Sequence, residues 1–468
     1  MEADTDHLNP FSLVRHFAED HHLHDLPCFR RHPDQERFVF HRDLNFETTW
    51  NLFMDAIQKS WWTRFWCVQE SLLAPAAIVV LGSWKIPWKM IKVCEINHKR
   101  HLATCCTTSS SSMPEEYVFY PDITVVSTRV DPDGTTSLMP GISSDLDRLF
   151  RSFRYKACQN PRDKVYGILG LLDPSSRCNL TVDYSLDTSL VYIMAMKAIL
   201  ADGRGDLRCL TGLGFNSQTS DLPSWVRDFQ VQPDMGSIHY EISRLKLYNL
   251  YDAAKASNAI LAFDSEHALI LQGRFVDKVD QVGQIATRRS LNEVWRIIQS
   301  WAALFSIHLP EGLTTSQYYE PKKQAFWRTL IGDVLFDNGE HSRRATQEDL
   351  EVLRRWLVST HESVERGVIP DVDQLMNSII VAIYGRSMFC SAKGNIGLCY
   401  PDCQPGDEIW TLEGSKVLSV LRRTSSTPSE KGITAIESIF CGDCYMHNFM
   451  DGEATHGSRY RVQEVKLR

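Results

Sequence analysis

The stretch Lys156–Pro174, "KACQNPRDKVYGILGLLDP", places an acid–base pair, Asp163 and Lys164, directly before a glycine-spaced apolar run. Three local features indicate that a helix begins here. Asn160 is a preferred helix N-cap, Pro161 fits the first helical position, and an acid at Asp163 favours the positive end of the helix dipole. The pair is therefore predicted to belong to a helix start rather than to a catalytic dyad.

The residues that follow repeat with helical spacing. The stripe predicted to be buried consists of Val165, Ile168, Leu169 and Leu172. Gly167 and Gly170 each weaken a helix by about 1 kcal/mol relative to Ala, so we expect them to allow a close packing approach. A phosphate-binding loop of the Walker type needs G-x-x-x-x-G-K-[ST], which the stretch lacks. The segment from Pro161 to Leu172 is predicted to be a buried structural helix.

The composition is that of a globular protein: 468 residues, 43% hydrophobic and 23% charged, enough for two or three domains. A formal charge of -8 gives no basic field for nucleic acid. The N-terminus "MEADTDHLNP" lacks the apolar region of a signal peptide, and "APAAIVVLG" is too short to span a membrane. Thirteen cysteines, an odd number, indicate reduced thiols. We therefore expect a cytoplasmic protein that binds neither nucleic acid nor membrane.

Changes in pattern along the chain predict an α/β fold with five regions. Residues 1–40 are polar and His-rich and are expected to be poorly structured or peripheral, and 102–146 carries the turn formers of a linker or long surface loop. Strands are expected at "HALILQGRFVDKVDQVG" within an otherwise helical middle. The regions are a polar segment at 1–44, an α/β region at 45–101, the linker at 102–146, a mainly helical region with a few strands at 147–375, and a small β-rich unit at 376–468.

The segment "WWTRFWCVQESLLA" (61–74) is the strongest candidate for chemistry, within a helix expected over 58–74. On that helix Trp62, Trp66 and Glu70 would share a largely apolar face, with both tryptophans buried. A carboxylate there is either paired with backbone amides or an arginine, or desolvated with a raised pKa, as in an acid–base or ribose-binding group. Both alternatives stay open. Glu70 is the catalytic candidate, and Trp62 and Trp66 are candidate pocket residues.

Other clusters give weaker signals. His22 and His24 of "RHFAEDHHLHD" (15–25) are too close to share one helix face, and no distant ligand set is apparent, so no metal site is expected. The pair in "CGDC" (441–444) lacks a second pair at zinc-finger distance and suits two small strand residues. The sequence contains no G-x-S-x-G, H-E-x-x-H or G-x-G-x-x-G motif, and no cofactor is predicted.

Together these blocks resemble the fungal heterokaryon-incompatibility (HET) domain family. The segment from Trp61 to Trp88 is similar to the family's R-x-W-x-x-Q-E block, which is followed by a strand, a glycine and a terminal tryptophan. The resemblance covers roughly residues 45–468 in ordered blocks. The further blocks are "NPRDKVYGILGLL", "VDYS" (182–185), "LPSWVRDF" (222–229), "GNIGLCYPDCQPGDEIWTLEGSKVLSVLRR" and "YMHNFMDGEA".

The family's initial "LSYxWG"-like and "IDxxCINQ"-like segments are not found in this sequence. The resemblance therefore implies that 45–101 is the C-terminal half of a HET-like domain, in a divergent or shortened gene product. By analogy the domain would be a partial TIR-like α/β fold. Some TIR domains cleave NAD with a glutamate in a W-C-x-x-E helix, which "WCVQE" (Trp66–Glu70) matches. The analogy would make Glu70 catalytic and NAD its substrate.

Three hypotheses follow from the resemblance. The first is a protein of fungal non-self recognition and cell death that acts by contacting another protein. The second is an enzyme or accessory protein of fungal secondary metabolism, with aromatic side chains lining a small-molecule pocket. The third is a TIR-like NAD glycohydrolase that uses Glu70. Enzyme and non-enzyme functions, and the oligomeric state, stay open at this point.

Overall fold

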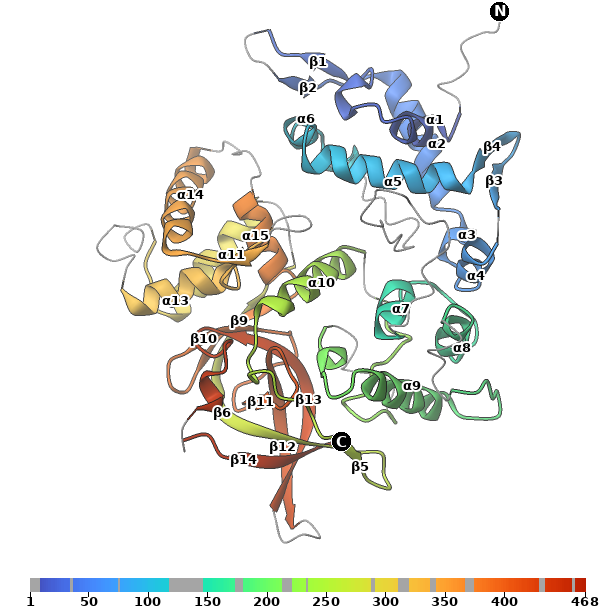
Figure 1. The fold of residues 1–468 in the computed structure, drawn as a ribbon. Coiled ribbons are helices and arrows are strands. Elements are labelled where there is room, and N and C mark those ends of the chain that lie inside the picture. Colours follow the sequence, from blue (N-terminus) through green and yellow to red (C-terminus); the bar gives the residue numbers. More distant parts are fainter. Residues whose placement is uncertain are drawn as a thin grey trace, which may run out of the picture. The chain divides into compact units, whose positions relative to one another are not determined.

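The structure is a computed structural model of the chain, and it divides into two compact units, Met1–Arg177 (unit 1) and Cys178–Arg468 (unit 2) (Figure 1). Each unit contains helices and strands, which confirms the mixed α/β composition. The structure describes residues 9–33, 37–74, 76–117, 146–172, 180–212, 221–232, 235–287, 291–309, 320–336, 342–366, 374–428, 434–456 and 459–468. Most of the expected linker, 118–145, lies outside the described residues.

Unit 1 combines short helices with two antiparallel hairpins. Its strands are β1 (Phe29–Arg31), β2 (Phe38–Phe40), β3 (Ile78–Leu81) and β4 (Trp84–Pro87). Its helices are α1 (Ser12–Ala18), η2 (Leu23–Asp25), α2 (Leu44–Ile57), α3 (Ser60–Thr63), α4 (Cys67–Leu72), α5 (Trp88–Ala103), α6 (Thr107–Ser111), η3 (Glu115–Tyr117), α7 (Leu146–Phe153) and α8 (Asp163–Leu169).

The expectation that the His-rich N-terminal segment is peripheral is wrong. Helix α1 packs against α5, and its Leu13, Val14 and Phe17 are buried in the same core as Trp50 and Ile91. The three residues follow the i, i+1, i+4 spacing of one helix face, a signal that the neighbouring histidines and acids obscure. Residues 9–33 of this segment therefore contribute directly to the core of unit 1.

The prediction of a single helix over 58–74 is also wrong, because the helix is interrupted at Arg64. Arg64 is extended between α3 and α4 and forms a parallel bridge with Ala157. The Phe65 N–H donates to the Ala157 carbonyl at 2.8 Å, and the Ala157 N–H donates to the Thr63 carbonyl at 2.6 Å. A tertiary pairing thus overrides local helix periodicity. As a result Trp66 is 38% exposed and Trp62 is half-buried, so the predicted burial of Trp66 is wrong.

Helix α8 confirms that a helix forms in the opening stretch, but it is shorter than the predicted Pro161–Leu172. Val165 and Ile168 on the helix and Leu172 after it are buried. The predicted N-cap is wrong: Arg162 occupies that position, and Asn160 and Pro161 lie in the preceding turn. Leu169, expected to be buried, is only half-buried, because its face of the short helix is not fully covered. The Asn160 Oδ1 accepts the Arg162 N–H at 3.1 Å and organises the turn that precedes the helix.

Gly167 provides the close approach that the sequence predicted. A Cβ at this position would lie 2.5 Å from the ring of Phe65, and one at Gly170 would lie 2.9 Å from the amide of Gln69. The Gln69 amide donates to the Gly167 carbonyl at 2.6 Å. The two glycines therefore allow α4 to pack directly on α8.

Unit 2 contains a large sheet that closes on itself. Six strands pair antiparallel in the order β6, β11, β12, β13, β10 and β9. The pairing of β9 with β6 completes the ring. β14 pairs with β6 and, in parallel, with β13. The strands of unit 2 are β5 (Ala262–Phe263), β6 (Leu269–Ile285), β7 (Val334–Leu335), β8 (Arg343–Arg344), β9 (Ser387–Ser391), β10 (Ile396–Cys399), β11 (Glu408–Leu412), β12 (Leu418–Pro428), β13 (Thr434–Met446) and β14 (Val462–Leu467).

The predicted strand at "HALILQGRFVDKVDQVG" is confirmed as β6, which belongs to the same sheet as the C-terminal strands. Helix α11 packs against β6, α13 packs against β10, and α10 packs against α15. The core between these elements contains Trp295, Trp301 and Trp327. The helices of unit 2 are α9 (Thr188–Asp202), η6 (Arg208–Leu210), α10 (Met235–Leu247), η7 (Tyr248–Leu250), α11 (Leu291–Leu304), α13 (Pro321–Leu330), α14 (Gln347–Arg366), α15 (Gln374–Ile383) and η9 (Glu453–Thr455).

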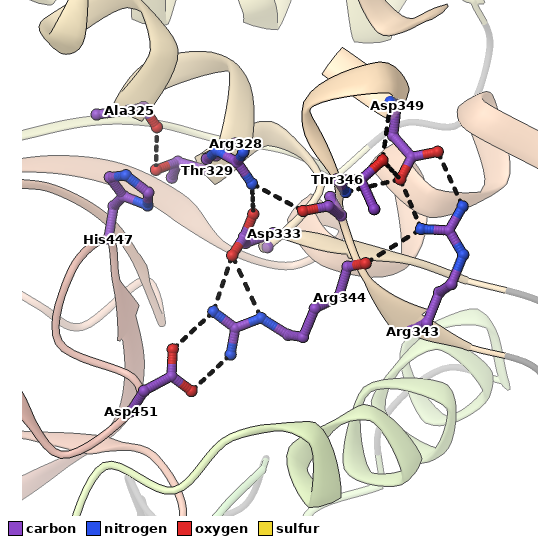
Figure 2. A network of polar contacts seen from close by, with 12 residues as sticks. Ala325, Arg328, Thr329, Asp333, Arg343, Arg344, Thr346, Asp349, His447 and Asp451 are labelled. Atoms are coloured by element: carbon purple, nitrogen blue, oxygen red, sulfur yellow. Dashed lines mark hydrogen bonds and ion pairs between the residues drawn. The ribbon is translucent and has the colours of Figure 1, made fainter.

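A polar network centred on Asp333 joins three elements of unit 2 (Figure 2). Its carboxylate pairs with Arg328 of α13 and accepts from Arg344 of β8 at 2.8 Å. Arg344 also pairs with Asp451, beyond β13, at 2.8 Å and lies over the ring of Tyr251. The network ties the helical layer to the sheet. Among the described helices, none combines the length and the apolar character that crossing a membrane requires.

Candidate functional site

A cavity of about 270 Å³ in unit 1 contains two of the three residues singled out from the sequence. Glu70 and Trp62 both line it, together with Trp61 and Trp88. The ring of Trp62 is stacked on that of Trp88 with centroids 5.7 Å apart, and Trp61 meets Trp62 edge-on at 5.0 Å. The cavity therefore presents tryptophan faces and one carboxylate to anything that enters it.

The interruption of the helix at Arg64 explains this arrangement. It ends α3 after Trp61 and Trp62 and lets α4 restart at Cys67, with Glu70 in its first turn. The indole N–H of Trp62 donates to the Ala56 carbonyl at 2.9 Å, which fixes the ring. The Lys156 ammonium donates to the Trp62 carbonyl, and burial lowers the pKa of Lys156 to about 8. Contacts with the chain before α8 thus hold the tryptophan segment in place.

Trp66 does not line the cavity but connects two sequence blocks. Its indole N–H donates to the Asp163 carboxylate at 3.1 Å. The neighbouring Lys164 is buried, and its ammonium donates to the carbonyls of Arg154, at 2.5 Å, and Lys156. The "PRDK" segment therefore anchors the tryptophan segment through side chains as well as beginning a helix. The structure brings Glu70 and Trp62 together and places Trp66 elsewhere.

Glu70 is exposed, so the desolvated state considered from the sequence does not occur in this structure. Its neighbour Cys67 is buried; burial raises the pKa of the Cys67 thiol, and the negative charge of Glu70 raises it further. A raised thiol pKa means a protonated, weakly nucleophilic sulfur. The site therefore offers a solvated carboxylate and the lysine Lys59 beside aromatic rings, an arrangement suited to binding a flat ring with polar groups at its edge.

Sequence reasoning missed Trp61 and Trp88 as cavity residues. On an unbroken helix Trp61 would lie one position before the face shared by Trp62, Trp66 and Glu70, and Trp88 lies 18 positions after Glu70 at the start of α5. The available signal was the terminal tryptophan of the resemblance block, which is Trp88 itself. Aromatic residues at both ends of one block are a pattern that a cavity between them can explain.

A second cluster in unit 1 was missed because its members are far apart in sequence. His22, His101, Cys105 and Cys106 bring one ligand atom each within 4.8 Å of one another. The Cys105 sulfur lies 3.2 Å from His22 Nδ1, 83 positions away in the chain. The expectation that no distant ligand set exists is therefore wrong, and these residues are the ones in the described chain that can hold a metal.

Cys441 and Cys444 of "CGDC" lie in β13 and are buried, as predicted for two strand residues. Burial raises the pKa of Cys441 to about 12 and that of Cys444 well above its usual range. Thiols in this state are poor nucleophiles. The pair therefore belongs to the core of the sheet.

Comparison with known proteins gives one informative result. The chain is 21% identical, over an alignment 504 positions long, to heterokaryon incompatibility protein 6, OR allele, of Neurospora crassa. The alignment covers 92% of this chain and 68% of that protein. No family model matches the chain. No solved structure matches it. This distant similarity supports the resemblance to heterokaryon-incompatibility proteins at the level of sequence.

Proposed function

We propose that the chain is a heterokaryon-incompatibility-like protein that acts in fungal non-self recognition and cell death by contacting another protein. The observation that carries the proposal is the similarity to the Neurospora crassa protein over 92% of the chain. Similarity of this extent spans both compact units rather than one shared module. A function shared by the two whole proteins explains this similarity better than one domain used for different functions does.

Unit 1 offers a surface suited to such a contact. Three apolar side chains around the cavity are exposed: Leu73 (50%), Ile78 (66%) and Val80 (56%), of which Ile78 and Val80 also line it. Ile78 and Val80 alternate along β3 and therefore point to the same side of the β3–β4 hairpin. Neighbouring exposed apolar residues of this kind mark protein contact surfaces.

Induced expression in a filamentous fungal host tests the proposal. We expect growth arrest and loss of viability, measured by colony extension and vital-dye uptake. The variant Ile78→Asp with Val80→Asp should abolish the arrest, because it charges the exposed face without opening the core. Ile260→Asp, an equally exposed position in unit 2 (70%), is the matched control and should leave the arrest intact. Normal growth with the unaltered protein present and folded would refute the proposal.

The tryptophan-lined cavity favours a second candidate function, the binding of a small aromatic molecule. In this case the chain would be an enzyme or accessory protein of fungal secondary metabolism. A volume of about 270 Å³ suits a ligand of one or two rings, below the roughly 300–1,000 Å³ of typical drug-sized sites. Gene deletion followed by metabolite profiling is the test. An unchanged profile rejects this function, and a missing or accumulating aromatic metabolite supports it.

A further inference from the structure

We propose that His22, His101, Cys105 and Cys106 form a structural zinc site in unit 1. This inference is independent of the proposed function. Soft thiolates together with imidazoles are the ligand set that favours zinc, and two of each make a closed tetrahedral site. His101 lies in the last turn of α5, both cysteines lie in the turn before α6, and His22 immediately precedes η2.

Four of the six distances between the ligand atoms lie within about 0.5 Å of the edges of a zinc tetrahedron, and all four atoms lie within 4.8 Å of one another. Bonds of about 2.3 Å to sulfur and 2.0–2.1 Å to nitrogen require edges of about 3.8 Å between sulfurs and about 3.5 Å between sulfur and nitrogen. The two sulfurs lie 3.8 Å apart. The Cys105 sulfur lies 3.0 Å from His101 Nδ1 and 3.2 Å from His22 Nδ1, and the Cys106 sulfur lies 3.6 Å from His22 Nδ1.

The Cys105 sulfur lies within reach of His22, His101 and Cys106. In the metal-free protein its thiol donates one proton and accepts only weakly, so these contacts are weak hydrogen bonds. Once both thiols are deprotonated, a cation at the centre satisfies all four atoms at once, because each contributes one lone pair. The convergence of the four atoms therefore suits a ligand set.

The surrounding residues prepare two of the ligands. The Asp20 carboxylate lies 3.0 Å from His101 Nε2, so Nε2–H donates to it and Nδ1 keeps its lone pair for the site. Such carboxylate–histidine pairs are the usual outer shell of zinc ligands. Asp20 is itself paired with Arg100 and adopts a left-handed backbone conformation, with φ of 67°, at the end of α1. The Leu23 N–H donates to the Cys106 sulfur at 3.4 Å, a contact that favours the thiolate.

A zinc ion can reach the site from solvent, and once bound it would connect two segments of unit 1. Cys106 is fully buried whereas Cys105 is exposed, so an ion can enter from the Cys105 side. Zinc binds the thiolate form of cysteine, so uptake of the ion must release the thiol protons. The bound ion would clamp the segment after α1 to the end of α5. Zinc would thereby stabilise the packing of α1 on α5.

Metal analysis of the full-length protein, purified under reducing conditions, tests the site. We expect about one zinc per chain by mass spectrometry after dialysis against metal-free buffer. Replacement by cobalt should give thiolate-to-cobalt charge-transfer absorption and the intense visible bands of a tetrahedral site. The double variant Cys105→Ser with Cys106→Ser should lose the ion and both spectral features. His22→Ala should weaken zinc binding strongly, whereas the matched control His21→Ala, at an exposed neighbouring histidine, should not.

Asp20→Asn separates zinc ligation from a merely structural role. It leaves all four ligands in place and should weaken zinc affinity about 10- to 100-fold, as loss of an outer-shell partner does. A chain that unfolds cooperatively but takes up neither zinc nor cobalt would overturn the proposal. Retention of a full zinc equivalent by the double cysteine variant would also overturn it.

Discussion

Arg386 and Asp443 in unit 2 lie 2.8 Å apart, each almost completely buried, and the Asp443 carboxylate also accepts from Tyr248 and from the Gly212 N–H. His22, His101, Cys105 and Cys106 in unit 1 converge at similar distances, but none of the four carries a fixed positive charge. The buried acid of unit 2 is neutralised by the protein itself, whereas the ligand atoms of unit 1 all present lone pairs to one point. A cluster of polar side chains can therefore stabilise a core when it contains its own counter-charge, and can bind an ion when it does not.

The largest expected effect is in unit 2. Arg386→Ala should destabilise the protein by about 3–5 kcal/mol, because it leaves the Asp443 carboxylate buried without its cation. Arg343→Ala is the matched control: its partner Asp349 lies 2.6 Å away, but the arginine is half exposed (Figure 2). That change should lower stability by at most about 1 kcal/mol. Equal losses in chemical denaturation would show that burial does not distinguish the two pairs.

The next prediction concerns pH and unit 1. Burial lowers the pKa of His98, on α5, to about 4 from an ordinary value near 6.5. Between these two values the unfolded chain binds the extra proton, so the stability present above pH 6.5 is lost as the pH falls towards 4. The difference amounts to up to about 3 kcal/mol.

His98→Phe isolates this contribution, because the ring of His98 packs edge-on against Phe17 and an apolar ring can replace it. We expect the variant to lose less stability than the unaltered chain between pH 7 and pH 4.5, measured by urea denaturation. His21→Phe, at an exposed position, should leave the pH dependence unchanged. Identical pH profiles for His98→Phe and the unaltered chain would contradict the prediction.

A smaller effect is expected where the two sequence blocks of unit 1 meet. Trp66→Phe removes the indole donor to Asp163, and Asp163→Asn removes the charge of the acceptor. A hydrogen bond to a carboxylate contributes about 1.5–3 kcal/mol when buried, and the partial exposure of Trp66 places this bond at the lower end. A double-mutant cycle should give a coupling of about 1 kcal/mol. Additive losses would mean that Asp163 supports α8 through contacts other than Trp66.

The elements predicted well from sequence are those whose signals are local. The helix α8 and its buried stripe follow from residues within two turns, although the helix begins two residues later than Pro161, and β6 follows from simple alternation. The break at Arg64 could not be predicted in this way, because it depends on pairing with Ala157, far along the chain. The cavity depends on that break, since an unbroken helix would have placed Trp62 and Trp66 on one face.

The zinc ligands show the same limit more clearly. His22 and Cys105 are separated by 83 positions. In each case the neighbouring residues in the sequence do not follow the spacing of a known zinc motif. Only the packing of α1 on α5 brings them together, and that packing depends on apolar residues such as Phe17 within a polar segment. Long-range packing, rather than motif spacing, determines both candidate sites of unit 1.

The smallest expected effect is on NAD, which we expect the purified chain to leave intact over hours. A nicotinamide glycosidase needs a carboxylate at the oxocarbenium-like centre and an apolar wall for the leaving ring. Glu70 and Trp62 supply these residue types in one cavity, but its volume of about 270 Å³ suits a ligand of one or two rings rather than a whole dinucleotide. The strands described beside it, β3 and β4, form an antiparallel hairpin rather than the parallel strands whose ends seat nucleotide phosphates.

Chromatography of NAD and nicotinamide measures the outcome, with Glu70→Gln and the exposed Glu116→Gln as a matched pair. Turnover that is lost in Glu70→Gln, kept in Glu116→Gln and accompanied by an unchanged circular dichroism spectrum would make the cavity catalytic. Turnover that survives Glu70→Gln would place the activity elsewhere in the chain. Either result would contradict the expectation of inactivity. Intact NAD would agree with the exposure of Glu70, because a solvated carboxylate stabilises a developing cation far less than a desolvated one does.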